Sequence, residues 1–157
     1  MGRHQLDIIP MNIDYLPFVS SWTKDVPPDL IKWQIENASA NKDQILLCLM
    51  DQTIPVGLME IFSAAFTELH VPYTPEPGTW SCRLTVDPSI KENIELQTDI
   101  INAFLVFIFR EKQASEILWE LPQAEVQSHL LATLSGFSKV GQIERFVLYR
   151  VPDLAGT

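Results

Sequence analysis

Two neighbouring stretches near the middle of the chain have the hydrophobic pattern of paired β-strands. In residues 44–50 both alternating sets of side chains are apolar, which is typical of a central strand covered on both faces. Residues 54–62 form a second apolar run, and the polar residues 51–53 between the two predict a hairpin turn. Pro55 lies at the entry of the second strand, where its missing N–H group is harmless. The pattern therefore predicts a hairpin inside a sheet.

Residues 95–112 have the strongest helical pattern in the chain. Leu96, Ile100, Phe104 and Ile108 follow one another at helical spacing. The second half is apolar nearly all round, which indicates a helix buried on more than one side. Such a helix packs against a sheet and against either another helix or another subunit, so a homodimer is one of the expected arrangements.

Shorter patterns of the same kinds predict the remaining elements. We expect further strands over 6–11, 80–86, 115–121 and 146–151, and further helices over 15–23, 29–38 and 125–134. The inner side of the last helix is expected to carry Val126, Leu130, Leu131 and Leu134. A meander followed by alternating helices and strands predicts an α/β fold with a central mixed sheet and helices on both faces. Residues 1–157 contain no linker and are expected to form one domain.

Residues 64–79 include three prolines and one glycine, which predict a long surface loop of a functional or disordered kind. Glu68 and His70 lie in this loop, which could fold over a substrate. His70 is a candidate base because imidazole exchanges a proton near neutral pH, although it could equally be a solvated loop residue. Glu60, on the second hairpin strand, is a candidate catalytic carboxylate that could also be an ordinary exposed strand residue.

The chain has 20 acidic and 11 basic residues, a formal net charge of −9. This charge repels a phosphate backbone, so nucleic acid is not an expected partner. It attracts a positively charged substrate such as an amine, although it could serve solubility alone. No clustered Cys, His or Asp pattern predicts a metal site.

The cysteines and the apolar runs bear on the expected compartment. Cys48 and Cys82 lie in strand-like runs and are expected to be reduced core residues. The longest strongly apolar run, residues 100–109, is too short to span a bilayer, and residues 1–7 have no signal-peptide core. We therefore expect a cytoplasmic protein without a membrane partner.

The order of these elements resembles that of the GNAT acyl-CoA N-acyltransferases, and scattered residues support the resemblance along nearly the whole chain. Trp80 and, eight residues on, Pro88 resemble the fourth strand of the branch that acetylates ribosomal proteins. The remaining similarities are in the opening strand, the last helix and the closing strands: Leu6 to Pro10 with Met11 and Asp14, Ser128, Leu131, Leu134, Gly136-Phe137, Val140-Gly141 and Phe146 to Tyr149.

This resemblance implies acetyl-CoA or another acyl-CoA as cosubstrate. In the family the pantetheine arm lies beside the fourth strand, where that strand splays from the fifth, which implicates Leu84, Thr85 and Val86. Backbone N–H groups in the following turn, at a helix N-terminus, hold the pyrophosphate, and this implicates Lys91, Asn93 and Ile94. A carboxylate, often through water, takes the proton from the attacking amine.

The turn after the fourth strand departs from the family pattern. Glycines should follow the basic residue at alternate positions, but Glu92 and Ile94 occupy such positions and obstruct a phosphate. Ala132 stands where a tyrosine general acid is frequent. Two functions are therefore predicted. One is an N-acyltransferase that acetylates a small amine or a peptide N-terminus by direct attack in a ternary complex. The other is a GNAT-fold binding or regulatory protein without CoA-dependent catalysis.

Overall fold

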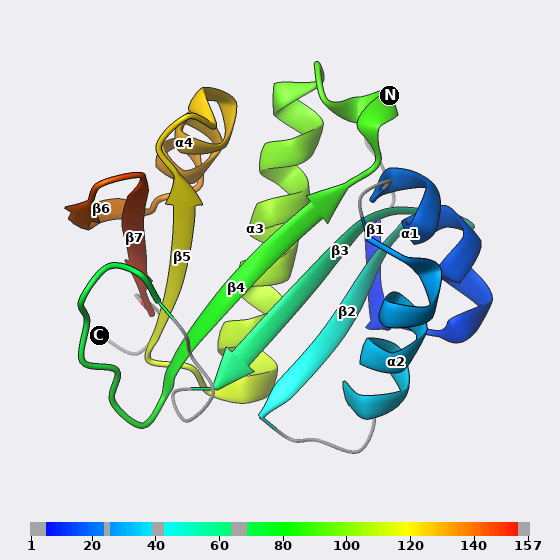
Figure 1. Ribbon diagram of the computed structural model, residues 1–157, viewed down its shortest axis with the longest axis horizontal. Helices are drawn as coiled ribbons and strands as arrows, with labels where there is room; N and C mark the ends of the chain where they lie inside the picture. Colours follow the sequence, from blue (N-terminus) through cyan, green and yellow to red (C-terminus); the bar gives the residue numbers. More distant parts are fainter. Residues whose placement is uncertain (1–5, 24–25, 39–42, 64–68, 154–157) are drawn as a thin grey trace.

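A seven-stranded sheet forms the centre of the computed structural model, which describes residues 6–23, 26–38, 43–63 and 69–153 (Figure 1). Its strands are β1 (Leu6–Pro10), β2 (Gln44–Asp51), β3 (Ile54–Ser63), β4 (Thr79–Val86), β5 (Glu116–Pro122), β6 (Ser138–Ile143) and β7 (Phe146–Pro152). They are arranged in the order β1-β2-β3-β4-β5-β7-β6. Only the β4–β5 pair is parallel, and the other neighbours are antiparallel.

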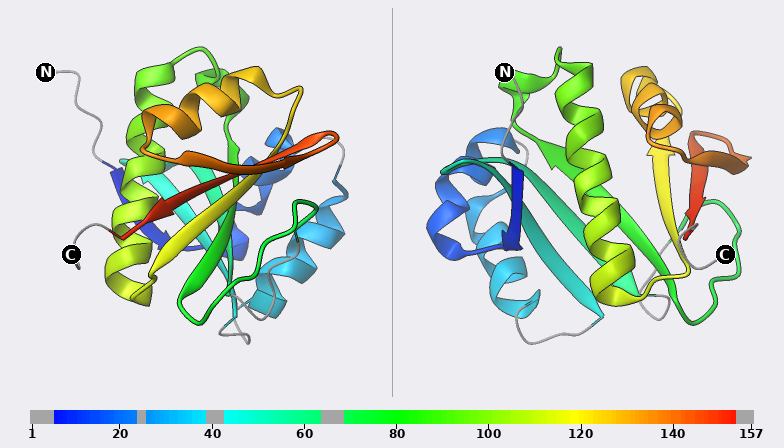
Figure 2. Two further views of the ribbon diagram at one scale, coloured as in Figure 1. Left: turned by 90° about the vertical axis from the view of Figure 1, so that its left-hand side faces the viewer. Right: turned by 180° about the vertical axis from the view of Figure 1, so that it is seen from behind.

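Helices cover both faces of the sheet (Figure 2). They are α1 (Leu16–Trp22), α2 (Pro28–Ala38), α3 (Ile94–Lys112) and α4 (Val126–Leu134), with 3-10 turns η1 (Ile13–Tyr15) and η3 (Pro88–Ile90). On one face Ile100 and Phe104 of α3 are fully buried against the strands, and Leu131 of α4 joins the same cluster. On the other face α1 and α2 pack over β2 and β3 through a smaller cluster that includes Val19 and Ile35. The predicted mixed α/β architecture is confirmed.

The described part of the proline-rich loop lies on the same face as α1 and α2, but over β5 and β7. Val71 of this loop is buried against Leu118 of β5 and Leu148 of β7. The opposite face of β5, which includes Ile117, belongs to the large cluster under α3. The loop therefore replaces a helix as the cover of this part of the sheet.

Local caps define the limits of the longest helix. The Asn93 side chain accepts a hydrogen bond from the Leu96 N–H at 3.0 Å and caps the N-terminus of α3. The helix ends at Lys112, and the capping residue Gln113 has a left-handed φ of 51°, a conformation that often terminates helices. The predicted helix over 95–112 thus differs from the observed one by a single residue.

The predicted inner side of α4 is wrong. Leu131 is buried, whereas Val126, Leu130 and Leu134 are 77%, 48% and 53% exposed. These three residues recur every fourth position and form one stripe, which points away from the sheet because Leu131 and Ala132 face it. Spacing alone identifies an apolar stripe but not the direction in which it points.

Two further observations concern the interior and the surface. Cys48 and Cys82 are free thiols and are buried, as predicted. Val106 of α3 is 59% exposed, so this helix is not enclosed on all sides in the single chain. Among the described residues, no helix is both long and apolar enough to cross a membrane.

Candidate functional site

β4 and β5 separate from each other part-way along their length. They pair only over residues 79–81 of β4 and 116–118 of β5. Beyond these positions β4 stays paired with β3, and β5 stays paired with β7. The sheet therefore opens into a wedge-shaped gap whose wide end lies toward the start of α4 and the turn before α3 (Figure 1).

The hydrogen bonds of β3 show which backbone groups of β4 face this gap. The Asp87 N–H donates to the Val56 carbonyl on β3 at 3.0 Å. Residues of an antiparallel strand direct their backbone groups to alternate sides. Thr85 therefore also faces β3, whereas Leu84 and Val86 direct their N–H and C=O groups into the gap. These groups form a free edge to which an extended ligand can bind in the manner of an added strand.

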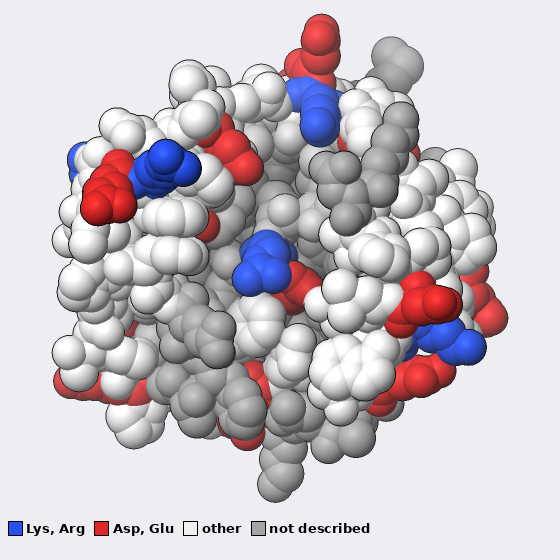
Figure 3. Space-filling view, viewed as in Figure 1, with Lys and Arg blue, Asp and Glu red and all other residues white. Residues whose placement is uncertain are grey.

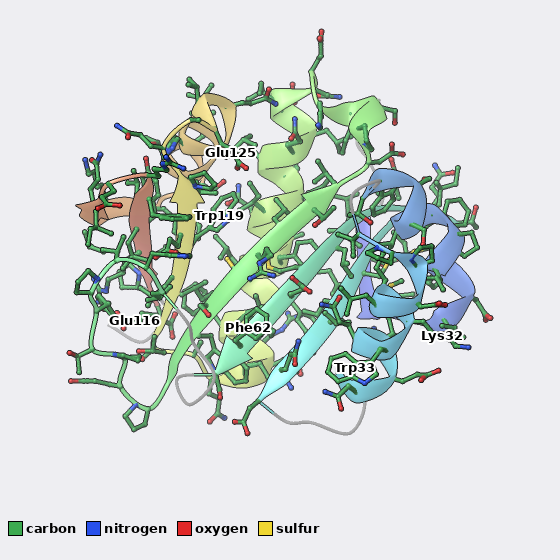
Figure 4. All side chains as sticks on the ribbon, in the orientation of Figure 1. Lys32, Trp33, Phe62, Glu116, Trp119 and Glu125 are labelled. Atoms are coloured by element: carbon green, nitrogen blue, oxygen red, sulfur yellow. The ribbon has the colours of Figure 1, made fainter. Side chains whose placement is uncertain are left out.

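The gap contains a cavity of about 620 Å³. Figure 3 shows it as a hollow near the centre of one face, with a basic and an acidic group side by side within it. Leu84 and Thr85 of β4 form part of one wall, and Trp119 of β5 and Glu125 form part of the other. Figure 4 shows Trp119 and Glu125 on one side of the gap and Phe62 of β3 on the other. The cavity is large enough for a small ligand together with part of a longer one.

His70 lies at this cavity, and three contacts hold it there. Its Nδ1 is 2.6 Å from Oε1 of Glu120, and its backbone N–H donates to Oε2 of the same carboxylate at 2.7 Å. The imidazole also stacks on Phe146, with ring centroids 3.7 Å apart. The Glu120 side chain is only 10% exposed, whereas that of His70 is 63% exposed. A buried carboxylate thus orients an accessible imidazole, the arrangement that prepares histidine for proton transfer.

Glu60 has a different environment from the one that the sequence predicts. Its side chain is 11% exposed rather than solvated, and its Oε2 is 3.4 Å from Nη1 of Arg83. Burial raises the pKa of Glu60, and the neighbouring Arg83 partly opposes this rise. Arg83 lines the cavity, but Glu60 is not among the lining residues. The Glu60 carboxylate therefore contacts and positions Arg83, which lines the cavity.

Most backbone N–H groups of the turn between β4 and α3 donate hydrogen bonds within the turn itself. The N–H groups of Ile90, Lys91 and Asn93 donate to carbonyl groups of the same turn, and the Asp87 side chain accepts from Ser89. The carbonyl groups are also engaged, because the Gln97 side chain donates to Ile90, Lys91 and Asn93, and that of Gln127 donates to Lys91. These donors are not free for phosphate, so the turn does not fit a pyrophosphate as the family's glycine-rich turn does.

The predicted cofactor residues therefore fall into two groups. Leu84 and Thr85 line the cavity and Val86 presents its backbone to the gap, whereas Lys91, Asn93 and Ile94 lie outside the lining. Of the loop candidates, His70 lies at the cavity, and Glu68 falls outside the described residues. Ala132 is fully buried, so no side chain replaces the tyrosine acid there.

Sequence reasoning missed Glu120 and Phe146, and it assigned no role to Arg83. Each lies on a strand in which alternation is clear, but alternation does not tell which loop or strand a side chain meets. Arg83 gave the one usable signal, because a charged residue stands within the otherwise uncharged strand β4. Among the described residues, no group of three or more His, Cys, Asp or Glu side chains could hold a metal ion.

No protein-family model and no curated protein sequence matches the chain. Solved structures do match. AAC(6')-Ib in complex with paromomycin and acetyl-CoA superposes with a TM-score of 0.81 at 12% identity, over 96% of this chain and 95% of that one. Campylobacter jejuni N-acetyltransferase PseH in complex with acetyl coenzyme A gives 0.73 at 8% identity, over 94% and 99%. A spermidine N-acetyltransferase SpeG chimera from Vibrio cholerae and hSSAT gives 0.76 at 15% identity, over 94% and 95%.

This chain has the GNAT fold. The identities are too low to show more than the fold, but the similarity extends over nearly the whole length of each protein. The GNAT resemblance predicted from the sequence is thereby confirmed. Its narrower form is not supported, because AAC(6')-Ib is an aminoglycoside acetyltransferase, SpeG is a spermidine N-acetyltransferase, and none of the three names points to the ribosomal-protein branch.

Proposed function

We propose that the protein is an N-acyltransferase that transfers an acyl group, such as acetyl, from acyl-CoA to a small amine or a peptide N-terminus. One observation carries the proposal: the unpaired backbone edge of Leu84 and Val86 borders a cavity that also contains His70 bound to a carboxylate. Solved structures with this fold contain acetyl-CoA or coenzyme A, and those of AAC(6')-Ib also contain paromomycin or kanamycin, which supports the same assignment.

Each part of the gap has a role in this proposal. Leu84 and Val86 bind the pantetheine arm as an added strand, and their N–H groups polarise the carbonyl that is attacked. The amine attacks the thioester carbonyl of acyl-CoA, a C–N bond forms as the C–S bond breaks, and CoA leaves as a thiolate that takes a proton from water. His70 accepts the proton of the amine at Nε2, because its Nδ1–H donates to Glu120. His70 is the better of the two predicted catalytic residues, since Glu60 lies outside the cavity lining.

We propose direct attack with both substrates bound at once. The alternative, an acyl group carried on the enzyme, needs a reactive nucleophile. Cys82 lines the cavity but is buried, and burial raises the pKa of its thiol far above the usual range. The thiolate that covalent catalysis requires is therefore not formed at neutral pH.

The proposal also covers the domain organisation, the compartment and the partners of the protein. Residues 1–157 act as one cytoplasmic domain, without nucleic acid, membrane or metal as a partner. The proposal includes a homodimer, because Val106 of α3 and Leu130 of α4 are apolar residues that are exposed in the single chain.

A second function, a binding or regulatory protein without CoA chemistry, is favoured by one observation. The turn before α3 uses its own N–H groups, and Glu92 and Glu95 add negative charge where a pyrophosphate is held in the family. In that case acyl-CoA should not bind even at millimolar concentration.

Replacing Leu84 with proline separates these functions. Proline removes one N–H group that faces the gap and leaves the hydrogen bonds to β3 intact. We expect Leu84→Pro to bind acetyl-CoA about tenfold or more weakly than Leu84→Ala, which loses the same packing but keeps the N–H group. Calorimetric titration measures this difference, and turnover of acetyl-CoA with a panel of amines should fall in parallel.

The matched control is Thr85→Pro, one residue away. It removes an N–H group that faces β3, so it should destabilise the sheet rather than affect the ligand selectively. The acyltransferase proposal fails if the wild-type protein shows neither acetyl-CoA binding nor amine-dependent thiol release, and the second function is then preferred.

A further inference from the structure

Arg83 is the one lysine or arginine among the described residues that line the cavity. It projects from the middle of β4, and its side chain is 70% exposed although the strand is central in the sheet. In a protein with a net charge of −9, a basic side chain here runs against the overall field. Its position within a cavity makes it a candidate for ligand binding.

The guanidinium of Arg83 contacts two side chains of β3, and these contacts leave most of its N–H donors available. Its Nη1 is 3.4 Å from Oε2 of Glu60, and its central carbon is 5.8 Å from the ring centroid of Phe62. These two side chains, both on β3, are its charged and aromatic neighbours. A guanidinium has five N–H donors in a rigid fork, so most of them remain available to a planar anion. Glu60 and Phe62 thus orient the fork and leave it open to the cavity.

The same cavity contains His70, the proposed base for an amine. An acceptor bound between these two side chains places its amine at the imidazole and an anionic group at the guanidinium. A polycation is disfavoured on the Arg83 side of the cavity, where the guanidinium would repel a second positive charge, whereas Glu125 on the opposite wall would attract an amine. The expected acceptor therefore differs from aminoglycosides and spermidine, the amines named for two similar acetyltransferases.

We propose that the acceptor is an amine that also carries a carboxylate, as free amino acids do, and that Arg83 binds this carboxylate. The inference deepens the proposed N-acyltransferase function and rests on it. Arg83 is then a specificity-determining residue, and Glu60 positions it. A bidentate arginine–carboxylate contact discriminates by about 10- to 100-fold against a neutral analogue.

Matched acceptors test this directly. With acetyl-CoA as donor, kcat/KM is measured for amino acids and for the corresponding amino acid amides, which keep the amine and the size but lack the charge. We expect the acids to be preferred at least tenfold, and Arg83→Gln to bring that ratio close to one. Arg110→Gln is the control, because its side chain is also 70% exposed and pairs with a neighbouring glutamate, Glu111 of α3. It should leave the ratio unchanged.

Two additional experiments separate loss of carboxylate binding from a folding defect and from an effect on turnover. If unpaired Glu60 destabilises Arg83→Gln, the double variant Glu60→Gln, Arg83→Gln should fold and show the same loss of preference. Binding of N-acetyl amino acids and their amides, measured by titration without CoA, tests carboxylate recognition independently of turnover.

The results distinguish the two claims. Equal or better transfer to amides, with no effect of Arg83→Gln, overturns the inference and leaves the acyltransferase function standing. Arginine-dependent binding of the N-acetyl amino acids without any transfer supports the carboxylate site and contradicts the proposed function.

Discussion

Replacing His70 with glutamine is expected to lower kcat by about 100- to 1000-fold, the usual contribution of a general base. Its imidazole is the accessible member of a pair with Glu120 and is fixed by stacking on Phe146. Glutamine fills a similar space but cannot accept the proton. In His70→Ala, which leaves the place of the ring empty, added imidazole should restore part of the rate. Steady-state kinetics measures both effects.

His129 provides the matched control. It lies on α4, with Nδ1 2.7 Å from the Tyr149 hydroxyl and Nε2 2.9 Å from the Pro122 carbonyl, and it does not line the cavity. His129→Gln should therefore reduce stability but leave kcat close to that of wild type. A His70→Gln protein within threefold of wild-type kcat contradicts the assignment of the base.

Glu116→Gln is expected to lower the free energy of unfolding by about 2–4 kcal/mol at pH 7. The Glu116 carboxylate lies where β4 and β5 still pair, below the gap (Figure 4). It accepts hydrogen bonds from the Tyr73 and Thr79 hydroxyl groups at 2.8 and 2.7 Å and from the Arg150 guanidinium. A glutamine cannot accept from all three donors, so at least one is left unsatisfied. Thermal unfolding should show a fall in Tm of roughly 5–15 °C.

The stability difference between wild type and Glu116→Gln should depend on pH in a direction set by the pKa of Glu116. Burial alone would raise the pKa of Glu116, but the hydrogen bonds from Thr79, Arg150 and Tyr73 outweigh it and lower the pKa below 4.5. Stability from such a group is complete above the unfolded-state pKa and is lost as pH falls through the folded-state value. The difference between wild type and variant should therefore narrow below about pH 4.5. A constant difference, or a loss no larger than that of the exposed control Glu111→Gln, contradicts this account.

The parts of the fold that depend on local pattern were predictable from the sequence. The two-sided apolar strand β2, the polar turn after it and the capped helix α3 each carry their signal within a few residues. The order of these elements is then enough to indicate the architecture. The gap-facing positions of Leu84 and Val86 were also within reach, because the family resemblance and the alternation of a strand indicate them without reference to a side-chain partner.

The chemical groups of the site were less predictable because they come together from distant segments. His70 and Glu120 are 50 residues apart, and Arg150 and Glu116 are 34 residues apart. No periodicity connects such pairs. The first forms when the loop before β4 packs on β5 and β7, and the second when β7 pairs with β5. The outward direction of Leu130 on α4 was missed for a related reason, since amphipathic spacing does not specify which neighbour is present.

The turn before α3 shows what a departure from a family pattern means physically. Its missing glycines predicted an obstructed phosphate site, and the structure adds that Lys91 and Asn93 donate their N–H groups within the turn. The gap beside β4 is nevertheless open. We therefore expect the main ligand contacts on the strand, and acyl-CoA should bind less tightly than in proteins with a glycine-rich turn.

The central claim is that the gap-facing edge of β4 binds the pantetheine arm, and backbone amide chemical shifts during titration with acetyl-CoA test it most directly. We predict saturable shifts that are largest at Leu84 and Val86, with smaller changes at Thr85, whose N–H group faces β3. An absence of shifts at millimolar acetyl-CoA, or shifts confined to residues away from the gap, would contradict the claim.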